Sequence, residues 1–217
     1  MSEILFLDRR HAGRRLAERL EGYRHDDPIV LGLPRGGVVV AAEVARALGA
    51  PLDVVVARKI GAPFEPELAI GAVAPNDIVL IDRPDRFSEK IVTHLVEIER
   101  EEMKRRIRLY RGENRELPLI EGRSVIIVDD GFATGLTAQA AALAVQKEEP
   151  RHLVMAAPVG AHEAVRRLRE IVDDVVCLLL PENFFAIGQW FVSFEQVSDD
   201  EVVALLHSQR GVAWPQS

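Results

Sequence analysis

The chain has 217 residues, of which 48% are hydrophobic and 28% are charged, values that are typical of a globular protein and exclude a disordered or fibrous one. Its 27 Lys and Arg residues stand against 34 Asp and Glu residues, which gives a net charge of −7. This acidic balance argues against nucleic acid or an anionic membrane as the main binding partner.

The cysteine content and the N-terminal region indicate the compartment. Cys177 lies in the apolar run 175–180 and has no second cysteine to pair with, which fits a buried thiol in a reducing compartment. The apolar run at residues 4–7 is too short for a signal peptide or a membrane-spanning helix. We therefore expect a soluble, cytoplasmic protein.

The first part of the chain alternates helical and strand patterns. Residues 8–22 predict an amphipathic surface helix. Apolar strands at 29–33 and 54–57 flank a helix at 38–48, which Gly49 and Pro51 end. Residues 29–57 therefore form a βαβ unit.

The next part has a different pattern. Residues 68–73 and 78–81 predict a β-hairpin around Ala74-Pro75-Asn76-Asp77. Residues 84–108 predict a highly charged helix whose outer face is solvated, with Ser88 at its N-cap.

The second half returns to the alternation of strands and helices. Strands are expected at 125–128, 152–157 and 175–180, with helices at 138–145 and 161–171 between them. This pattern predicts a three-layer, doubly wound α/β fold with a mainly parallel sheet. Residues 181–194 hold five aromatic residues without periodicity, which suggests a cap or lid, and a helix is expected at 198–207.

The richest chemistry follows the strand at 125–128. Asp129 and Asp130 end this strand, and the turn after them holds glycines, Thr134 and Thr137. The backbone N–H groups and hydroxyls of such a turn suit an anion. The two carboxylates suit the hydroxyls of a sugar, or a Mg²⁺ ion that also takes phosphate oxygens and water.

Two other turns carry positive charge directly after strands. Pro34-Arg35-Gly36-Gly37 offers a guanidinium and glycine backbone that a ligand can approach closely, and Arg58 and Lys59 follow the next strand. Ligands bind beyond the carboxyl ends of the strands in such sheets. The three turns together predict a phosphorylated sugar that carries a metal-bound polyphosphate.

At this point the chain resembles a known family. The run Val125-Ile126-Ile127-Val128-Asp129-Asp130-Gly131-Phe132-Ala133-Thr134-Gly135-Leu136-Thr137 is similar to the phosphoribosyl-pyrophosphate signature of type I phosphoribosyltransferases. The match consists of an apolar strand, an acid pair, two variable positions and then small-Thr-Gly-x-Thr, and the resemblance covers residues 25–180. It implies one phosphoribosyltransferase-like domain over 1–217, with its core at 25–180, a hairpin and helical insertion at 60–116, and a C-terminal hood at 181–217.

The resemblance also implies roles for individual residues. Asp129 and Asp130 would hold the ribose hydroxyls and, through water, Mg²⁺. The catalytic residues would be Asp129, Asp130 and Lys59. The ribose and 5′-phosphate would be bound by Asp129, Asp130, Gly131, Phe132, Ala133, Thr134, Gly135, Leu136 and Thr137, and the pyrophosphate by Arg35, Gly36, Gly37, Arg58 and Lys59.

The implied reaction transfers the 5-phosphoribosyl group of Mg-phosphoribosyl pyrophosphate to a small nitrogenous acceptor, with release of pyrophosphate, as part of nucleotide metabolism. We expect Lys59 or an Arg from the charged segment to close over the leaving group. Phe185 and Trp190 are candidates for an acceptor-stacking surface, with a place in the hydrophobic core as the equal alternative. A homodimer is left open.

Ala133 restricts the acceptor. Enzymes for hypoxanthine and guanine carry Asp at this position, so a 6-oxopurine is disfavoured here. A narrower resemblance joins this chain to a bacterial branch of phosphoribosyltransferases whose acceptor is unknown, through Pro34-Arg35-Gly36-Gly37, Arg58-Lys59-Ile60-Gly61-Ala62-Pro63 and Ala186-Ile187-Gly188-Gln189-Trp190.

Other functions remain open. One is a non-catalytic, phosphoribosyl-pyrophosphate-sensing regulatory protein, and another is a hydrolase-like or interaction protein on the same scaffold. A dinucleotide-binding enzyme is disfavoured because no Gly-x-Gly-x-x-Gly turn with a later ribose-binding acid is present. The six histidines lack ligand spacing, so no zinc site is expected.

Overall fold

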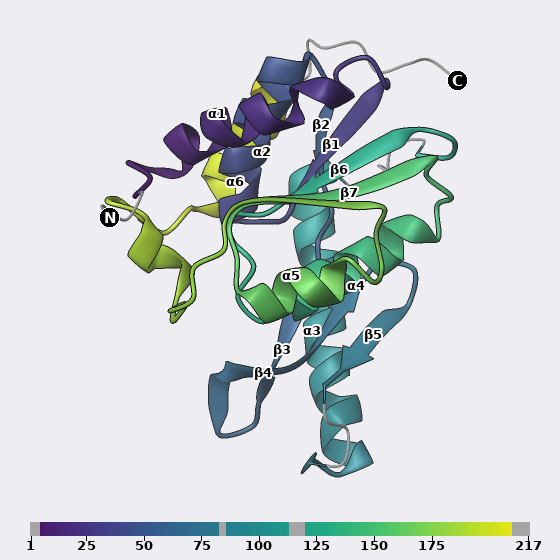
Figure 1. Cartoon of the computed structure of the whole chain (residues 1–217). Helices are drawn as coiled ribbons and strands as arrows, with labels where there is room; N and C mark the ends of the chain where they lie inside the picture. Colours follow the sequence, from purple (N-terminus) through teal and green to yellow (C-terminus); the bar gives the residue numbers. More distant parts are fainter. Residues whose placement is uncertain (1–4, 83–85, 113–119, 210–217) are drawn as a thin grey trace.

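A five-stranded parallel sheet forms the centre of the computed structural model, which describes residues 5–82, 86–112 and 120–209. The spatial order of its strands is β2-β1-β6-β7-β8, and every neighbouring pair is parallel (Figure 1). The strands span Pro28–Gly32 (β1), Leu52–Val54 (β2), Ser124–Val128 (β6), His152–Val159 (β7) and Asp174–Leu179 (β8). The expected α/β class with a mainly parallel sheet is confirmed.

Helices cover both faces of this sheet, which is why its central strands are continuously apolar. Val30, Ile126 and Val154 face one side and join a buried cluster with α1 (Arg9–Leu20) and α2 (Gly36–Leu48). Ile29, Ile127 and Met155 face the other side and join α4 (Leu136–Gln146) and α5 (His162–Leu168). A 3₁₀ turn at Glu21–Tyr23 follows α1.

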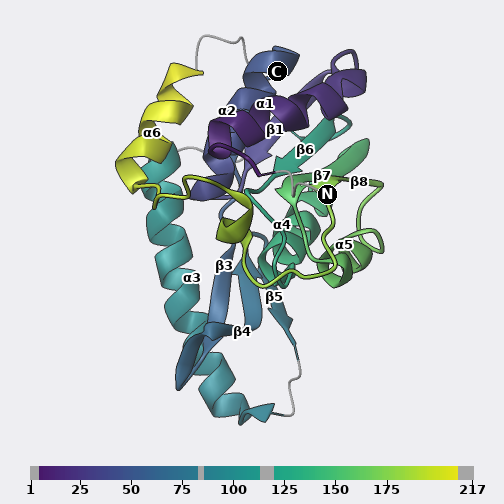
Figure 2. The same ribbon diagram turned by 60° about the vertical axis from the view of Figure 1, so that its left-hand side comes forward.

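A second, smaller sheet lies beyond the carboxyl ends of the central strands. Its strands β3 (Arg58–Ala62), β4 (Glu65–Ala74) and β5 (Ile78–Ile81) are antiparallel. The long helix α3 (Glu89–Arg111) covers one face through Val96 and Met103, and α4 lies against the other (Figure 2). The outer face of the charged helix is exposed, as expected, and its apolar stripe closes the core of this sheet.

The C-terminal hood crosses the edge of the molecule near the N-terminus (Figure 1). It contains a 3₁₀ turn at Ile187–Trp190 and leads to α6 (Asp199–Ser208), which buries Val202, Leu205 and Leu206 beside α2 and α3. Phe6 packs with Phe191 in a third buried cluster. The N-terminal segment and the hood thus share one small core.

One expected strand needs correction, and one observed strand was not expected. The strand expected at 54–57 lies at Leu52–Val54 instead. After Val54 the chain leaves the parallel sheet, and it enters the second sheet at Arg58. β3 was not predicted from the sequence because its first two residues, Arg58 and Lys59, are charged. The expected hairpin is present, but it forms two strands of a three-stranded sheet.

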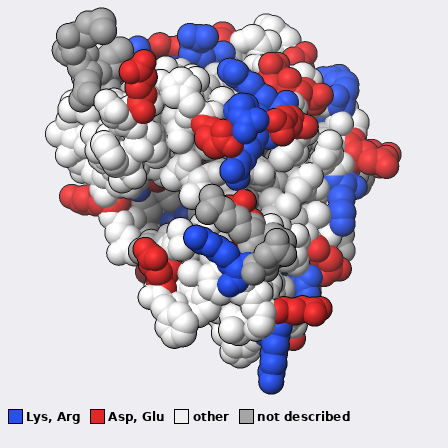
Figure 3. All heavy atoms as spheres, turned by 60° about the horizontal axis from the view of Figure 1, so that its bottom comes forward, with Lys and Arg blue, Asp and Glu red and all other residues white. Residues whose placement is uncertain are grey.

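Charges of both signs are mixed on the surface. Figure 3 shows Lys and Arg side chains beside Asp and Glu side chains over one face of the molecule rather than gathered in a basic stripe. Some ion pairs lie within one helix, such as Arg105 with Glu102 and Arg166 with Glu163. Among the described residues, no helix combines the length and apolar character that a membrane crossing requires.

One buried ion pair joins helix α3 to the parallel sheet. Arg111, at the end of α3, is 5% exposed and donates to a carboxylate oxygen of Asp53 at 3.2 Å and to the carbonyl of Val54. Asp53 is 8% exposed in β2. The pair therefore fixes the end of the long helix to the edge of the parallel sheet.

We expect Arg111→Leu to destabilise the fold by about 3 kcal/mol, because it leaves the buried Asp53 carboxylate without its cation. Urea denaturation followed by circular dichroism measures this loss. The exposed neighbour Arg108 is the matched control, and Arg108→Gln should stay within about 0.5 kcal/mol of the unchanged protein. Equal effects of the two substitutions would contradict a structural role for the buried pair.

Candidate active site

The acid pair lies where two neighbouring strands end. Gly32 of β1 is paired with Val128 of β6, so the loops that leave these two strands are neighbours. Asp129 follows Val128, and its N–H donates to the carbonyl of Ala156 at 3.0 Å. The N–H of Asp130 donates to Oδ1 of Asp129 at 2.8 Å. The backbone of the sheet thus holds both carboxyl groups in fixed positions.

The two carboxyl groups differ in their surroundings. Asp129 lines a cavity of about 540 Å³. Its withdrawal from water, together with the neighbouring Asp130, raises its pKa well above the usual value for aspartate. Asp130 instead forms an ion pair with Arg9, whose Nε lies 2.7 Å from Oδ2. Asp129 is therefore the member of the pair that lines the cavity.

The turn after the acid pair forms the floor of the same cavity. Gly131, Ala133, Thr134, Gly135 and Thr137 all line it. Gly135 is the N-cap residue of α4, so the free N–H groups of the first helical turn lie at this loop. Phe132 is different, because its side chain is 1% exposed in the core, its N–H donates to the carbonyl of Val159 at 2.9 Å, and its carbonyl accepts from the N–H of Ala161 at 2.8 Å.

The loop of residues 34–37 passes against the acid pair without room for side chains. A Cβ atom on Gly36 would overlap Oδ2 of Asp130 and would lie 2.8 Å from Nε of Arg9. A Cβ atom on Gly37 would lie 2.8 Å from Cα of Asp129. Glycine at both positions is required by this approach. The backbone of the loop therefore lies beside the carboxylates, whereas the expected approach of this backbone to pyrophosphate stays a prediction.

The three expected cations of the pyrophosphate site lie in different environments. Lys59 lines the main cavity and an adjoining one of about 340 Å³. Arg58 donates from Nε to Oε2 of Glu99 in α3 at 2.9 Å. Arg35 lies outside the set of described residues that line the main cavity, with Nη1 3.9 Å from Oδ1 of Asp199. The structure thus brings Lys59 directly to the cavity.

The hood supplies an apolar wall to the cavity. Phe185, Ile187, Gly188 and Phe194 line it, and Phe185 is 87% exposed. Trp190 is not at this wall; it is 6% exposed and packs with Phe6 and Phe191. Its position supports a place in the hydrophobic core rather than at an acceptor-stacking surface, because Trp190 packs against the N-terminal segment at Phe6.

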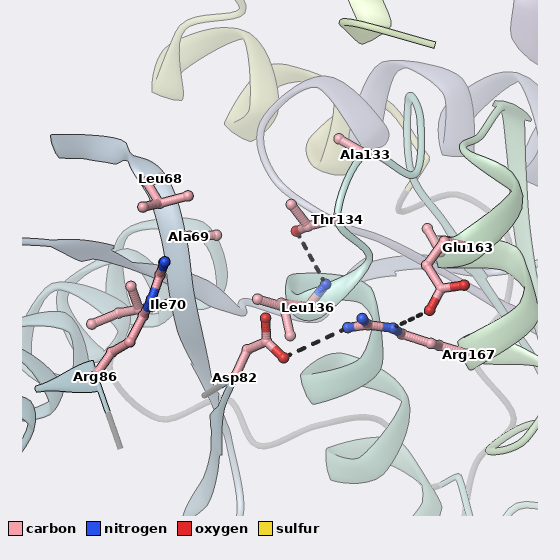
Figure 4. A pocket seen from close by; sticks show the side chains of 11 residues that line it. Leu68, Ala69, Ile70, Asp82, Arg86, Ala133, Thr134, Leu136, Glu163 and Arg167 are labelled. Atoms are coloured by element: carbon pink, nitrogen blue, oxygen red, sulfur yellow. Dashed lines mark hydrogen bonds and ion pairs between the residues drawn. The ribbon is translucent and has the colours of Figure 1, made fainter. Parts of the chain in front are cut away.

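A second cavity of about 250 Å³ lies beside the turn at residues 131–137 and shares Ala133 and Thr134 with the main cavity. Figure 4 shows Arg167 of α5 between Asp82 and Glu163, with N–O distances of 3.8 and 3.0 Å. The N–H of Leu136 points to Oγ1 of Thr134 at 3.4 Å (Figure 4). The ion pair of Arg167 with Asp82 thus joins α5 to the end of β5, whereas the hydrogen bond of Leu136 lies within the turn.

Arg9 is the residue that the sequence analysis missed. It belongs to a helix with five arginines that was interpreted as an ordinary surface helix. Its guanidinium is buried beside Asp130, and its central carbon lies 3.7 Å from the centroid of the Phe194 ring. The only available signal was that the acid pair required a cation, and the sequence alone did not indicate which arginine would supply it.

We expect Asp129→Asn to stabilise the protein in the absence of ligand. An aspartate whose pKa is raised in the folded state contributes stability below about pH 4 that is lost as the pH rises through the raised pKa. Asparagine does not ionise, so the variant does not lose this stability. Its melting temperature should therefore exceed that of the unchanged protein at pH 8, by about 2 to 4 °C for each kcal/mol by which its free energy of unfolding is higher.

The control for this prediction is the exposed Asp26. Asp26→Asn should leave the melting temperature unchanged at pH 8, and the difference between the Asp129→Asn variant and the unchanged protein should shrink toward pH 4. A melting temperature of the Asp129→Asn variant that falls below that of the unchanged protein at pH 8 would show that the ionised carboxylate of Asp129 does not destabilise the folded protein.

Comparison with known proteins agrees with this geometry. A family model described as phosphoribosyl transferase domain matches residues 7–198. A Mycobacterium tuberculosis protein named "Putative phosphoribosyl transferase" is 47% identical over 206 residues, which cover 93% of this chain and 46% of that protein. The chain therefore spans about half the length of the curated relatives it matches.

Two solved structures share the fold. The crystal structure of a Thermus thermophilus protein has a TM-score of 0.77 and 42% identity, and the match covers 94% of this chain and 99% of that one. A protein of Aquifex aeolicus has a TM-score of 0.51 and 14% identity, with 83% and 78% covered. With the family match over nearly the whole chain, these findings show that the chain belongs to the phosphoribosyl transferase domain family.

Proposed function

We propose that the protein binds Mg-phosphoribosyl pyrophosphate and transfers its 5-phosphoribosyl group to a nitrogenous acceptor with release of pyrophosphate. One observation carries the proposal. A single cavity is lined by the Asp129 carboxylate, by the turn at the N-terminus of α4 and by Lys59. These groups match, in order, the hydroxyls, the 5′-phosphate and the pyrophosphate of that ligand.

The ribose and its 5′-phosphate would lie over the end of β6. Asp129 would accept hydrogen bonds from the ribose hydroxyls. The 5′-phosphate would be bound by N–H groups of residues 133–137 and by the hydroxyls of Thr134 and Thr137, since the N–H of Phe132 already donates to the carbonyl of Val159. The positive end of the α4 dipole favours a phosphate at this place. The fixed carboxylate and the fixed helix would together set the position of the ribose C1 atom.

The site fits Mg²⁺ as a partner of the ligand rather than as a resident ion. The described residues contain no group of three or more His, Cys, Asp or Glu that could hold a metal ion. Mg²⁺ keeps several waters and combines few carboxylates with substrate phosphates, which suits the Asp129 carboxylate at this cavity. When bound, the ion would neutralise charge that develops on the departing pyrophosphate.

Lys59 is the cation best placed to stabilise the leaving group, because it lines the cavity. Arg58 would have to exchange its contact with Glu99, and Arg35 its contact with Asp199, before either could bind pyrophosphate. The backbone of Gly36 and Gly37 can approach the same phosphates. The displacement itself needs little covalent participation, so positioning and charge stabilisation supply most of the rate.

The acceptor would bind between the turn and the hood. Phe185 offers an exposed ring for stacking, and Phe194 and Ile187 complete the apolar wall. Ala133 also lines the cavity, and its methyl group neither donates nor accepts a proton. This supports an acceptor other than a 6-oxopurine.

Isothermal titration tests the binding part of the proposal. We expect the unchanged protein to bind phosphoribosyl pyrophosphate in the presence of Mg²⁺, and Asp129→Asn and Thr137→Val each to weaken binding at least about tenfold, as the loss of a hydrogen bond to a charged group does. Asp26→Asn should bind as the unchanged protein does. Absence of binding by the unchanged protein would refute the proposal.

Turnover separates an enzyme from a sensor of the same ligand. We expect pyrophosphate release that depends on an added base, measured over adenine, uracil, hypoxanthine and guanine, with the two 6-oxopurines the poorest. We expect Lys59→Gln to lower kcat by about tenfold or more, because it removes a cation from the leaving group. Tight binding without release on any nitrogenous base would favour the regulatory alternative.

A further inference from the structure

Arg9 joins the acid pair to the hood. Its side chain is 11% exposed. Its Nε donates to Oδ2 of Asp130 at 2.7 Å and its Nη1 donates to the carbonyl of Glu195 at 2.7 Å. Its planar face lies over the ring of Phe194. One side chain from the start of α1 thus contacts the acid pair and the hood together.

The contact with Asp130 is tightly confined. Gly36 approaches both partners so closely that a Cβ atom there would overlap Oδ2 of Asp130. The guanidinium therefore lies against the glycine loop and the carboxylate on this side. A rigid planar fork suits this place better than a flexible ammonium, because it donates in two directions at once.

The contacts with the hood continue into the cavity wall. Phe194, which carries the guanidinium on its ring, is one of the residues that line the main cavity. Phe194 also packs against Phe191, with ring centroids 4.9 Å apart, and Phe191 packs against Phe6 at 5.4 Å. The position of the cavity wall therefore depends on the residues that precede and begin α1.

Backbone hydrogen bonds join the same two segments. The N–H of Phe6 donates to the carbonyl of Trp190 at 2.9 Å, and the N–H of Val192 donates to the carbonyl of Phe6 at 2.8 Å. The N–H of Ser193 donates to the carbonyl of Leu7 at 2.9 Å. Residues 6–9 and 190–195 thus form one unit, and Arg9 is its connection to the acid pair.

We propose that Arg9 is a positioning residue that holds the Phe194 wall of the acceptor site at a fixed place relative to Asp129 and Asp130. Its part in acceptor binding rests on the proposed function, whereas its part in fixing the hood does not. The positive charge of Arg9 compensates the carboxylate of Asp130, and its planar guanidinium donates to Glu195 and stacks on Phe194 in the hood. The two roles can be separated because lysine keeps the first and loses the second.

Amide hydrogen exchange on the ligand-free full chain tests the hold on the hood. We expect exchange at Val192 and Ser193 to be at least about tenfold faster in Arg9→Lys and in Arg9→Gln, because each loses a hydrogen bond and a stacked contact. Arg10 is the matched control, as it lies next in α1 and pairs with Glu43 at 3.5 Å with a half-exposed side chain. Arg10→Gln should change exchange by less than about twofold.

Ligand measurements then separate the two roles. Arg9→Lys should bind Mg-phosphoribosyl pyrophosphate within about threefold of the unchanged protein, because the cation beside Asp130 remains. Its KM for the base that best supports turnover should rise about tenfold. Arg9→Gln should weaken both, and Arg10→Gln neither.

Two outcomes would overturn the inference. One is hood exchange in Arg9→Lys that equals that of the unchanged protein, and the other is an equal loss of phosphoribosyl pyrophosphate and base affinity in Arg9→Lys. If Arg9→Gln fails to fold, Arg9→Lys alone decides, since it keeps the buried cation. If the unchanged protein does not bind phosphoribosyl pyrophosphate, the proposed function fails, and hydrogen exchange still decides whether Arg9 positions the hood.

Discussion

The close approach of the loop at residues 34–37 to the end of β6 is the constraint on which the site depends. Two carboxyl groups lie side by side at this point, and a backbone without side chains passes over them. The parallel pairing of β1 with β6 sets the distance between the two loops. Any side chain at Gly36 would displace either Asp130 or Arg9, so the geometry of the acid pair follows from the geometry of the sheet.

The positive charge of Arg9 makes the two acids of the pair differ. Two buried carboxylates without a cation would repel each other and would hold a proton between them. Arg9 compensates Asp130, which leaves Asp129 to carry the remaining negative charge toward the cavity. This division gives the two acids different tasks although they are neighbours in sequence. The pKa of Asp129 is raised because burial and the neighbouring Asp130 disfavour its ionised form more than the N–H of Asp130 and Arg9 stabilise it.

The sequence predicted those features that depend on neighbouring residues. The strand at 124–128, its acid pair and the helix that follows form one continuous pattern, so the sheet and the phosphate-sized turn could be derived from it. Arg9, Trp190 and β3 could not, because their roles come from contacts with distant segments. Arg9 has the same chemistry as Arg10, and only the fold distinguishes the arginine at Asp130 from the one at Glu43.

The contacts of Arg9 also bear on how the site assembles. Its hydrogen bonds join residues that are 121 and 186 positions apart in the chain. Contacts of such large sequence separation carry a high cost in chain entropy and depend on structure that is already formed. During synthesis the cation emerges first, the carboxylates follow in the middle, and the aromatic wall arrives near the end. The last strand of the central sheet ends at Leu179, so a growing chain contains all five strands only shortly before it contains Phe194.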